Sequence, residues 1–569
     1  GPARDHIEYV LRQKDLEGSP RVKMGSPEEF FHWMEQEGGP RHTYVGELYF
    51  SAHRGTYTAQ AGIKQNNRAS EIALHEMEFI GSLALVSGFH YELDKADRLW
   101  KTLLFHQFHD ILPGSSIQKV YQQAFTAHQA LREEASQITS DTAEYLLSKD
   151  GGISFFNSLS FERKALVTLP EQYKDGAVTK EGCFIPVQKL EDGSVLAAVT
   201  IPSCGAVSLY PVSGQKTASE EIVSLRQTEA GYCMENEYIS ALIDSFGQVT
   251  SFVLKCSGRE FAAGSMNQLR LYKDQPRAFD AWDIDSNYRE EEPEKAVVEE
   301  ILIVRQGLEA VLQIKGKIGK SKYTQQISLK AGHKRLEFHT TVEWKELHRL
   351  LKTSFPAAVH ASNARHEMQF GYVERPTHRS RLYDKDRFEV CNHRYTALCD
   401  ESHGAAILNN CKYGISVNKN DMELTLLRAT ASPEMRADNR TQIFSYAFYA
   451  WEGSFLSSDV IRQGYEFNIE PLKAKGGIPA FEAVKINQKN IFLETIKPAE
   501  DGSGEIILRF YEAAGAAGNA DITINLPIKS IKECNMLEQV KEELKFEKQE
   551  VISLSFRAFE IKTLRLCAK

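Results

Sequence analysis

The sequence lacks a long apolar run, a basic stretch and any low-complexity tract. Its longest candidate apolar run, residues 80–86, contains Gly81 and Ser82 and is much shorter than the ~20 residues needed to cross a bilayer. The formal net charge is −9, with no basic cluster to meet a polyanion. We therefore expect no membrane span and no nucleic-acid partner, and a neutral or weakly charged ligand fits this composition better.

Cysteine is sparse, with nine residues scattered over a chain of 569. An odd number of cysteines in so long a chain favours reduced thiols and a cytoplasmic location. Cys391, Cys399 and Cys411 lack the spacing of a zinc knuckle, so we expect them to serve in packing. The chain is too long for a single hydrophobic core, which predicts several domains.

The first 57 residues alternate short helical patterns with polar loops. A helix is expected at 5–12, followed by a brief segment at 21–24 and by a second helix that Ser26 and Glu29 cap. This alternation is typical of an α/β domain, of which residues 1–57 would be only the end.

The hydrophobic period then changes along the rest of the chain. From residue 58 to about 150, three amphipathic helical patterns with short connections predict a helix bundle. Beyond Gly151 the period is two for roughly 400 residues, which predicts several antiparallel β-sandwiches rather than one. The expected fold class is therefore multidomain α+β: a remnant of an α/β domain, a three-helix bundle at 58–150 and β domains at 151–222, 223–475 and 476–569.

A polar corner follows the second helical pattern. The apolar residues of 93–104 form one core-facing stripe at about 100° per residue, and continuing that period places His109 on the opposite side. The Pro-Gly pair at 113–114 is expected to end this helix. Ser115, with Gln118 three residues later, predicts a capping box that opens the next helix. The corner would therefore be a helix–turn–helix joint that presents His109 outward.

His109 is followed directly by Asp110. A neutral nitrogen donor beside an anion at a rigid joint suits a metal site or an acid/base site. Periodicity and spacing alone favour a simpler interpretation, in which the histidine caps the last carbonyls of its helix beside a solvated aspartate.

Several motifs in chain order shift this balance. These motifs are Gly-Glu-Leu-Tyr at 46–49, His-Arg-Gly-Thr-Tyr-Thr at 53–58, Gln-Phe-His-Asp-Ile-Leu-Pro-Gly-Ser-Ser-Ile at 107–117, Pro-Arg-Ala-Phe-Asp-Ala-Trp-Asp-Ile-Asp at 276–285, and the runs at 370–378, 388–394 and 408–414. By these motifs the sequence resembles the α-mannosidases of glycoside hydrolase family 38, particularly their cytosolic and bacterial branch.

The resemblance implies that His109 ligates a zinc ion and that Asp110 contacts sugar hydroxyls. It also implies that the nucleophilic carboxylate and the other zinc ligands lie in an N-terminal β/α catalytic domain that ends near residue 57. Zinc that binds two vicinal hydroxyls can hold a sugar ring and favour its flattening. His106, where the family usually has asparagine, is a weaker candidate for a second ligand.

Three residues near the end of that domain are further candidates. Glu47 would act as the general acid if a strand end placed it opposite the metal, although it could equally pair with Arg54. Tyr49 and Arg54 would line the sugar subsite, or else serve in ordinary packing.

The loop that carries Asp280, Trp282, Asp283 and Asp285 combines an indole face with carboxylates. That combination suits stacking on a pyranose ring while accepting hydroxyl hydrogen bonds. The alternative is a solvated turn of a β-sandwich.

The leading functional hypothesis is a retaining α-mannosidase that releases terminal α-linked mannose from oligosaccharides with an active-site zinc ion. Its expected partner is the N-terminal catalytic segment of the same protein, without which this chain should be inactive, and assembly into a homo-oligomer is left open. The alternatives are a non-catalytic carbohydrate-binding fragment and a hydrolase of mannosylglycerate type.

Overall fold

The computed structural model describes residues 2–214, 223–545 and 551–568. The chain divides into two compact units, residues 1–49 and 50–569. Because each unit is compact by itself, we describe them separately.

The smaller unit contains two helices, α1 (Arg4–Gln13) and α2 (Pro27–Gln36). The predicted capping box is confirmed, since the Glu29 N–H donates to Ser26 Oγ at 3.1 Å and the Ser26 N–H donates to the Glu29 carboxylate at 3.3 Å. Among residues 2–49 the structure has no strand and no buried side chain, so the segment at 21–24 makes no sheet pairing. Two amphipathic helices alone cannot enclose a core, which is why this unit has none.

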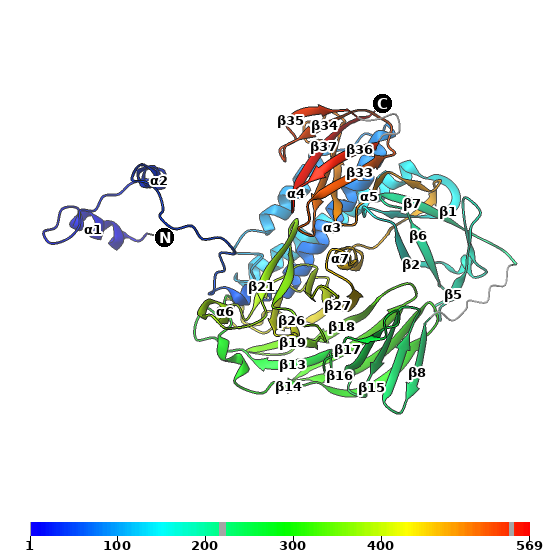
Figure 1. Cartoon of the computed structure of the whole chain (residues 1–569), viewed down its shortest axis with the longest axis horizontal. Coiled ribbons are helices and arrows are strands. Elements are labelled where there is room, and N and C mark those ends of the chain that lie inside the picture. The colour runs from blue at the N-terminus through cyan, green and yellow to red at the C-terminus, as the bar shows by residue number, and fades with distance from the viewer. Residues whose placement is uncertain (1, 215–222, 546–550, 569) are drawn as a thin grey trace. The chain divides into compact units, whose positions relative to one another are not determined.

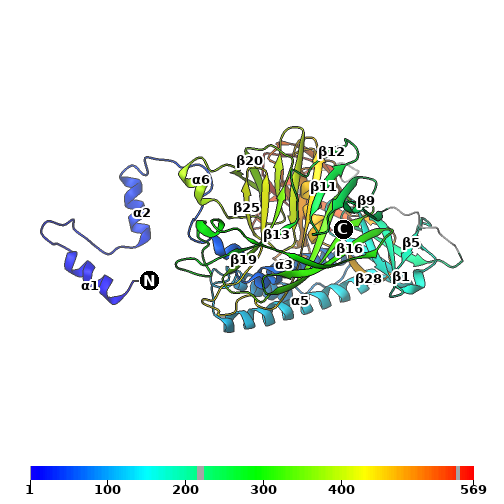
Figure 2. The same ribbon diagram turned by 90° about the horizontal axis from the view of Figure 1, so that it is seen from below.

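The larger unit begins with a short helix and a three-helix bundle, as predicted (Figures 1 and 2). The elements are η1 (Arg54–Tyr57), α3 (Ala61–Val86), α4 (Leu93–His106) and α5 (Gln118–Leu146). Leu74, Met77, Leu99, Leu103 and Leu131 share the bundle core. Burial of apolar faces in this way supplies most of the stability of such helices.

The joint between α4 and α5 differs from the prediction. α4 ends at His106, seven residues before Pro113, and residues 107–113 form successive turns. The predicted capping box is wrong, because Ile117 is the N-cap residue of α5 and makes no side-chain cap. The Ser116 N–H instead donates to the Tyr121 hydroxyl at 2.6 Å. Contacts with other parts of the chain, described below, determine the path of this joint.

The first β layer pairs strands from two distant parts of the chain. One antiparallel sheet has the order β28 (Leu472–Gly477), β1 (Ser148–Asn157), β7 (Gly205–Pro211), β3 (Ala177–Thr179) and β4 (Phe184–Ile185), with β29 (Phe481–Glu482) also on β7. It packs on the sheet β2 (Arg163–Leu169), β6 (Val195–Ile201) and β5 (Val187–Lys189), next to η2 (Glu171–Tyr173). The domain boundary predicted near residue 475 thus falls inside β28, a strand of the layer that begins at residue 148.

The second β region contains three sheets (Figure 1). A five-stranded sheet has the order β12 (Arg259–Glu260), β11 (Val249–Leu254), β10 (Ile239–Ile243), β9 (Gly231–Glu235) and β8 (Ser224–Thr228). A six-stranded sheet has the order β14 (Glu294–Lys295), β13 (Gln268–Lys273), β19 (Arg349–Pro356), β26 (Asp421–Arg428), β25 (Gly414–Asn418) and β22 (Val390–Cys391). A nine-stranded sheet has the order β15 (Val297–Arg305), β16 (Glu309–Ile318), β17 (Ser321–Lys330), β18 (Arg335–Glu343), β27 (Thr441–Glu452), β24 (His403–Asn409), β23 (Tyr395–Cys399), β20 (Asn363–Met368) and β21 (Gly371–Pro376).

The six- and nine-stranded sheets face each other as a sandwich. Phe355 of β19 stacks on Phe448 of β27 with ring centroids 5.7 Å apart, and it meets Phe338 of β18 edge-on at 5.6 Å. Aromatic pairs of this kind contribute beyond the area that they bury. The connections carry η3 (Ser286–Arg289), α6 (Leu382–Asp386) and α7 (Val460–Asn468).

The last β region is a smaller sandwich that covers α3. Its sheets are β30 (Val484–Ile486), β33 (Gly518–Ile524) and β36 (Val551–Phe556), and β31 (Ile491–Pro498), β32 (Ile506–Glu512), β37 (Ile561–Ala568), β34 (Ile528–Cys534) and β35 (Val540–Leu544). Phe79, Ile80 and Leu83 of α3 belong to its core. α3 is therefore buried against the bundle on one side and a sandwich on the other, and several of its charged residues are buried with it.

Glu78 on α3 generates the first prediction. Its carboxylate accepts a hydrogen bond from Trp100 Nε1 at 2.9 Å, and burial raises the pKa of Glu78 to about 7. The folded protein therefore binds the proton of the Glu78 carboxyl more tightly than the unfolded chain does. The contribution of this proton to stability is complete below pH 4.5, the ordinary pKa of a glutamate, and is lost as the pH rises through about 7. We expect Glu78→Gln to leave stability unchanged at pH 4.5 and to raise the free energy of unfolding by about 1–3 kcal/mol at pH 8.5.

Urea unfolding followed by helical circular dichroism at both pH values measures this difference. Glu92→Gln, at an exposed position before α4, is the matched control and should show no pH-dependent gain. Equal stability of Glu78→Gln and the unaltered protein at pH 8.5 would show that Glu78 is not a strained buried acid.

Candidate functional site

The joint between α4 and α5 exposes the predicted His-Asp pair. The side chains of His109 and Asp110 are 77% and 65% exposed, and His109 Nε2 lies 3.5 Å from Asp110 Oδ2. The Phe108 ring lies 4.3 Å from the imidazole, centroid to centroid. Within the described ranges, no group of three or more His, Cys, Asp or Glu side chains could hold a metal ion. The joint can therefore offer a ligand pair but not a complete metal site.

The His106 side chain contacts other groups than this pair. Its Nδ1 lies 2.7 Å from the Thr102 carbonyl oxygen within α4, and its ring packs 5.1 Å from that of His128. Burial, and then His106, lowers the pKa of His128 to about 4, so His128 is neutral at neutral pH. The second-ligand role considered for His106 is not supported by this geometry, because its ring is used inside the bundle.

A buried lysine fixes the joint to the start of α3. Lys64 Nζ donates to the Ala59 carbonyl at 2.6 Å and to the Leu112 carbonyl at 2.9 Å. Burial lowers the pKa of Lys64 to about 7, although Asp438 opposes the shift. Gly114, at φ +89°, is also essential to this contact, because a Cβ there would lie 2.2 Å from the Ala59 oxygen. The path of the joint is thus set by residues 59–64.

Arg54 and Asp283, predicted independently as sugar-binding residues, meet each other. Arg54 Nη1 lies 3.2 and 3.4 Å from the two Asp283 carboxylate oxygens, and Arg54 Nε donates to the Asp386 carbonyl at 3.0 Å. The guanidinium carbon also lies 4.4 Å from the centre of the Phe388 ring. With these partners, Arg54 is a buried cation that ties η1 to the 280–285 loop, and its contact with sugar stays a prediction.

The other carboxylates of the 280–285 loop are also used by the fold. Asp280 Oδ2 accepts from the Ala431 and Ser432 N–H groups at 2.7 and 3.1 Å and lies 3.2 Å from His348 Nε2. Asp285 accepts from the Arg277 N–H at 3.1 Å. Asp280 Oδ1 has no hydrogen-bond partner among the described residues, and binding of sugar hydroxyls by these carboxylates stays a prediction. Trp282 is half-buried, and the Gly55 N–H donates to its carbonyl at 2.8 Å, so this loop does reach η1.

Arg428 holds this loop in place, and sequence reasoning missed it. Its Nε donates to Asp274 at 2.7 Å, Nη1 donates to the Ala281 carbonyl at 3.2 Å, and Nη2 donates to the Asp280 and Asp283 carbonyls at 3.1 and 2.8 Å. An arginine at the end of an apolar strand usually faces solvent, so the pattern of β26 gave no signal of this burial. Lys64 was also missed, because a lysine in a helical pattern usually faces solvent too.

Glu47 and Tyr49 belong to the smaller unit and are half-buried. The predicted strand end is wrong, since residues 37–49 form no strand and the Tyr44 hydroxyl donates to the Glu47 carbonyl at 3.0 Å. The roles of Glu47 as general acid and of Tyr49 in the sugar subsite stay predictions.

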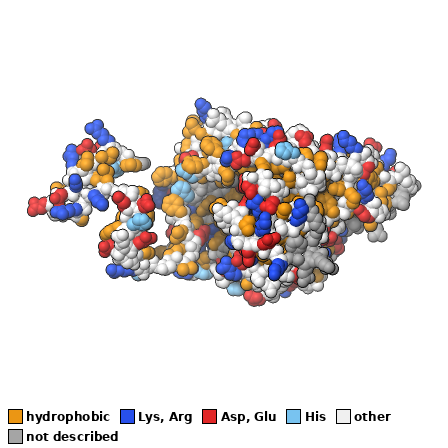
Figure 3. Space-filling view, turned by 90° about the horizontal axis from the view of Figure 1, so that it is seen from above, with side chains coloured by type: hydrophobic (Ala, Val, Ile, Leu, Met, Phe, Trp, Pro, Cys, Tyr) orange, Lys and Arg blue, Asp and Glu red, His pale blue; other side chains and the backbone are white. Residues whose placement is uncertain are grey.

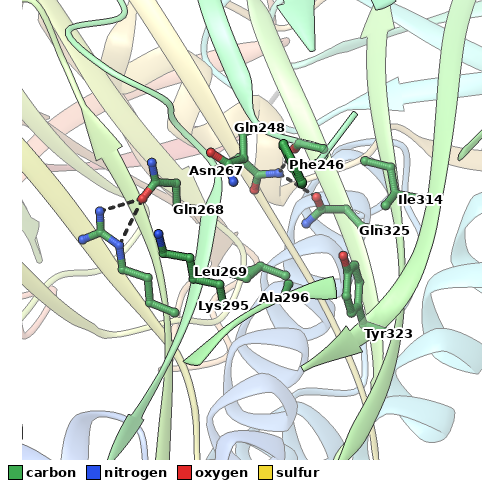
Figure 4. A pocket seen from close by; sticks show the side chains of 12 residues that line it. Phe246, Gln248, Asn267, Gln268, Leu269, Lys295, Ala296, Ile314, Tyr323 and Gln325 are labelled. Carbon is green, nitrogen blue, oxygen red and sulfur yellow. Dashed lines mark hydrogen bonds between the residues drawn. The ribbon is translucent and has the colours of Figure 1, made fainter. Parts of the chain in front are cut away.

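A recess in the large sandwich is too small for a sugar (Figure 4). It has a volume of about 50 Å³ and lies between Asn267, Gln325 and Tyr323. Asn267 Nδ2 donates to Gln325 Oε1 at 2.7 Å, so its polar groups are already paired. We assign it no ligand beyond water.

Charges of both signs are mixed on the surface. On the face of the larger unit shown in Figure 3, acidic and basic side chains are interspersed among hydrophobic ones. No helix within the described ranges is long and apolar enough to cross a membrane.

The larger unit thus combines a three-helix bundle with several antiparallel sandwiches, an architecture that matches domains of glycoside hydrolases. Three family models match the chain in order: the α-mannosidase middle domain at residues 51–146, the glycosyl hydrolases family 38 C-terminal domain at 234–436, and the family 38 C-terminal β-sandwich domain at 490–564. The chain belongs to glycoside hydrolase family 38.

Curated relatives agree in sequence. Human α-mannosidase 2C1 is 33% identical over 95% of this chain and 52% of its own length, and Dictyostelium discoideum α-mannosidase G is 31% identical over 99% and 56%. The chain spans about half the length of the curated relatives that it matches. The crystal structure of an α-mannosidase from Enterococcus faecalis V583 has the same fold, with a TM-score of 0.80 at 16% identity over 99% of this chain and 74% of that one.

Gly114 generates the second prediction. We expect Gly114→Ala to lower the free energy of unfolding by about 2–4 kcal/mol, because the new Cβ meets the Ala59 carbonyl in a backbone conformation that favours glycine. Gly88→Ala is the matched control, since φ is +92° there and the nearest atom lies 3.8 Å from the new Cβ. It should cost only about 1 kcal/mol. Thermal and urea unfolding of both variants measure the difference, and equal losses would contradict a steric role for Gly114.

Proposed function

We propose that the intact protein is a retaining α-mannosidase that releases terminal α-linked mannose with an active-site zinc ion. The observation that carries this proposal is the exposed His109–Asp110 pair on a joint that buried Lys64 holds rigid. An imidazole and a carboxylate are donors that zinc accepts, so these residues fit the metal. His109 would be a ligand, and Asp110 would accept hydrogen bonds from sugar hydroxyls.

The zinc would supply a Lewis acid that holds vicinal hydroxyls of the mannose. The remaining ligands and the nucleophile would come from the N-terminal catalytic segment of the same protein, because the described residues offer no third ligand near the pair. A retaining mechanism needs two carboxyl groups about 5 Å apart, and we assign Glu47 the general-acid role. Trp282 and Tyr49 would line the sugar subsite, while Arg54 and Asp283 position the loop.

Exposed apolar side chains in the stretch of chain around His109 support such an arrangement. Leu104, Phe105, Phe108 and Ile117 are each more than half exposed, and the Phe108 ring contacts His109. Apolar side chains grouped in this way on a protein surface usually mark an interface. We propose that the catalytic segment covers this surface and closes the site over the sugar. All nine cysteines are free thiols, which supports a reducing, cytoplasmic location.

The third prediction tests the ligand. In the intact enzyme, His109→Ala should remove bound zinc and lower kcat/KM at least about 100-fold, because a site that loses one of few ligands binds metal poorly. The melting temperature of the β domains should stay the same, since the His109 side chain is mostly exposed. His360→Ala, at an exposed position of the large sandwich, is the control and should keep both zinc and activity. Full zinc content in His109→Ala would place the ligand elsewhere.

The fourth prediction concerns the 569-residue chain alone. It should fold, because the bundle and sandwiches have their own cores, but hold little zinc and not cleave a chromogenic α-mannoside. Metal analysis and turnover of the purified chain test this, with addition of the N-terminal catalytic segment as the positive control.

Stoichiometric zinc and sustained turnover without that segment would contradict the proposed division of the catalytic machinery. Absence of turnover even with the segment would favour the alternative of a non-catalytic carbohydrate-binding protein.

A further inference from the structure

A polar cavity of about 570 Å³ lies between the first β layer and the large sandwich. Its walls come from β2, from β17 and β18, and from residues 466–473, which run from the end of α7 into β28. This volume lies in the range of small-molecule sites. None of its lining residues belongs to the candidate mannosidase site, so any ligand here would be a second one.

One wall of the cavity is a buried ion-pair network that is internally balanced. Glu337 accepts from Arg335 Nε at 2.7 Å and from Lys330 Nζ at 2.8 Å, and His339 Nε2 lies 3.3 Å from it. Arg335 also lies 3.3 Å from Glu466. Lys330 and Arg335 hold the pKa of Glu337 well below its usual range although burial opposes this. Two cations and two anions therefore neutralise each other here.

Arg163, at the start of β2, also lines the cavity but is not part of this balanced network. The residue is 4% exposed, and one of its nitrogens donates to the Ile469 carbonyl. Its Nε and Nη2 are buried and have no hydrogen-bond acceptor among the described residues. The charges that act on it are those of Glu466, Glu76, Glu470 and Arg335, but no carboxylate in the described ranges lies within ion-pair distance. A buried guanidinium with two unmet donors is costly unless something else supplies the acceptor.

Other residues of the cavity lining also have polar groups that could bind a ligand. His333 has a buried Nδ1 that no described group contacts, and burial lowers the pKa of His333 to about 3, so the ring is neutral and its Nδ1 can accept a hydrogen bond from a hydroxyl. Lys164 and Lys473 add two ammonium groups without a carboxylate partner in the part of the chain that the structure describes, while Glu470 is the one acidic lining residue outside the network. The lining carries five basic and three acidic residues, an excess of positive charge.

We propose that this cavity binds a small oxyanion carried by a hydroxylated molecule, such as a sugar phosphate, with Arg163 as its main contact. The oxyanion supplies the acceptors that Arg163 Nε and Nη2 lack, after a change of side-chain torsion that turns the guanidinium into the cavity. The hydroxyl groups bond to His333 Nδ1 and to amides such as Asn468, which also lines the cavity. Lys164, next to Arg163 on β2, and Lys473, whose Nζ donates to the Thr168 carbonyl at 2.7 Å near the other end of that strand, add positive charge to the lining.

Calorimetry and thermal shift on the full chain test the proposal with three probes: inorganic phosphate, a hexose 6-phosphate and the neutral hexose. We expect the hexose phosphate to bind most tightly, phosphate to bind more weakly and the neutral hexose not to bind. Phosphate binding equal to that of the hexose phosphate would assign the site to the free ion, whereas failure of both anions to bind would overturn the proposal.

Variants locate the site. Arg163→Met should weaken hexose phosphate binding about 10- to 100-fold, as expected for the loss of charge-assisted hydrogen bonds. Without ligand, its melting temperature should be no lower than that of the unaltered protein, because an unpaired buried charge is removed. Arg462→Met is the matched control: Arg462 also has a buried Nε without a partner among the described residues, but it lies outside the cavity lining. It should bind the ligand normally.

Lys164→Met, at an exposed lining position next to Arg163, is a second test of the site should Arg163→Met fail to fold, and it should weaken binding about tenfold. Binding that is unchanged in both cavity variants would overturn the proposal. Because no variant touches His109 or its neighbours, turnover of the intact enzyme reports separately on the mannosidase site.

Discussion

The candidate site depends on one fully buried guanidinium. Arg428 pairs with Asp274 and donates to three carbonyls of the 280–283 loop, so this irregular segment keeps one conformation. Gly55 lies directly against it, since a Cβ there would be 2.0 Å from Arg428 Nη1. Once η1 is placed in this way, Arg54 reaches Asp283. A charged donor suits this task because buried carbonyls without a partner cost more than the desolvation of one well-paired cation.

A second buried basic side chain extends the same principle to the His-Asp joint. Lys64 bonds to carbonyls on both sides of the contact between residues 59 and 112, and Gly114 allows the two backbones to approach. His109 therefore projects from a fixed frame although its own side chain is exposed. Rigid support under an exposed ligand is what a metal-binding histidine needs, because a loosely held ligand binds metal weakly.

Three buried basic side chains, Arg428, Lys64 and Arg163, differ in how completely the fold provides them with hydrogen-bond acceptors. Arg428 and Lys64 donate to several protein acceptors, whereas two nitrogens of Arg163 have none within the described ranges. Arg428 bonds to one carboxylate and three carbonyls, so this fold does provide acceptors for a buried guanidinium elsewhere. That Arg163 borders a large polar cavity instead is the reason to interpret it as a binding group.

The sequence by itself determined the α+β class, the order of a three-helix bundle and β-sandwiches, the capping box of Ser26 and the exposure of His109. Each of these follows from hydrophobic period or from residues a few positions apart. Tertiary structure alone decided where α4 ends, that β28 joins β1, and which groups of the fold Arg54, Asp280 and Asp283 contact. The partners of these residues lie up to several hundred positions away, as with Arg54 and Asp283, which are 229 positions apart. A local pattern shows which face is apolar, but a buried charge is specified only by the distant groups that surround it.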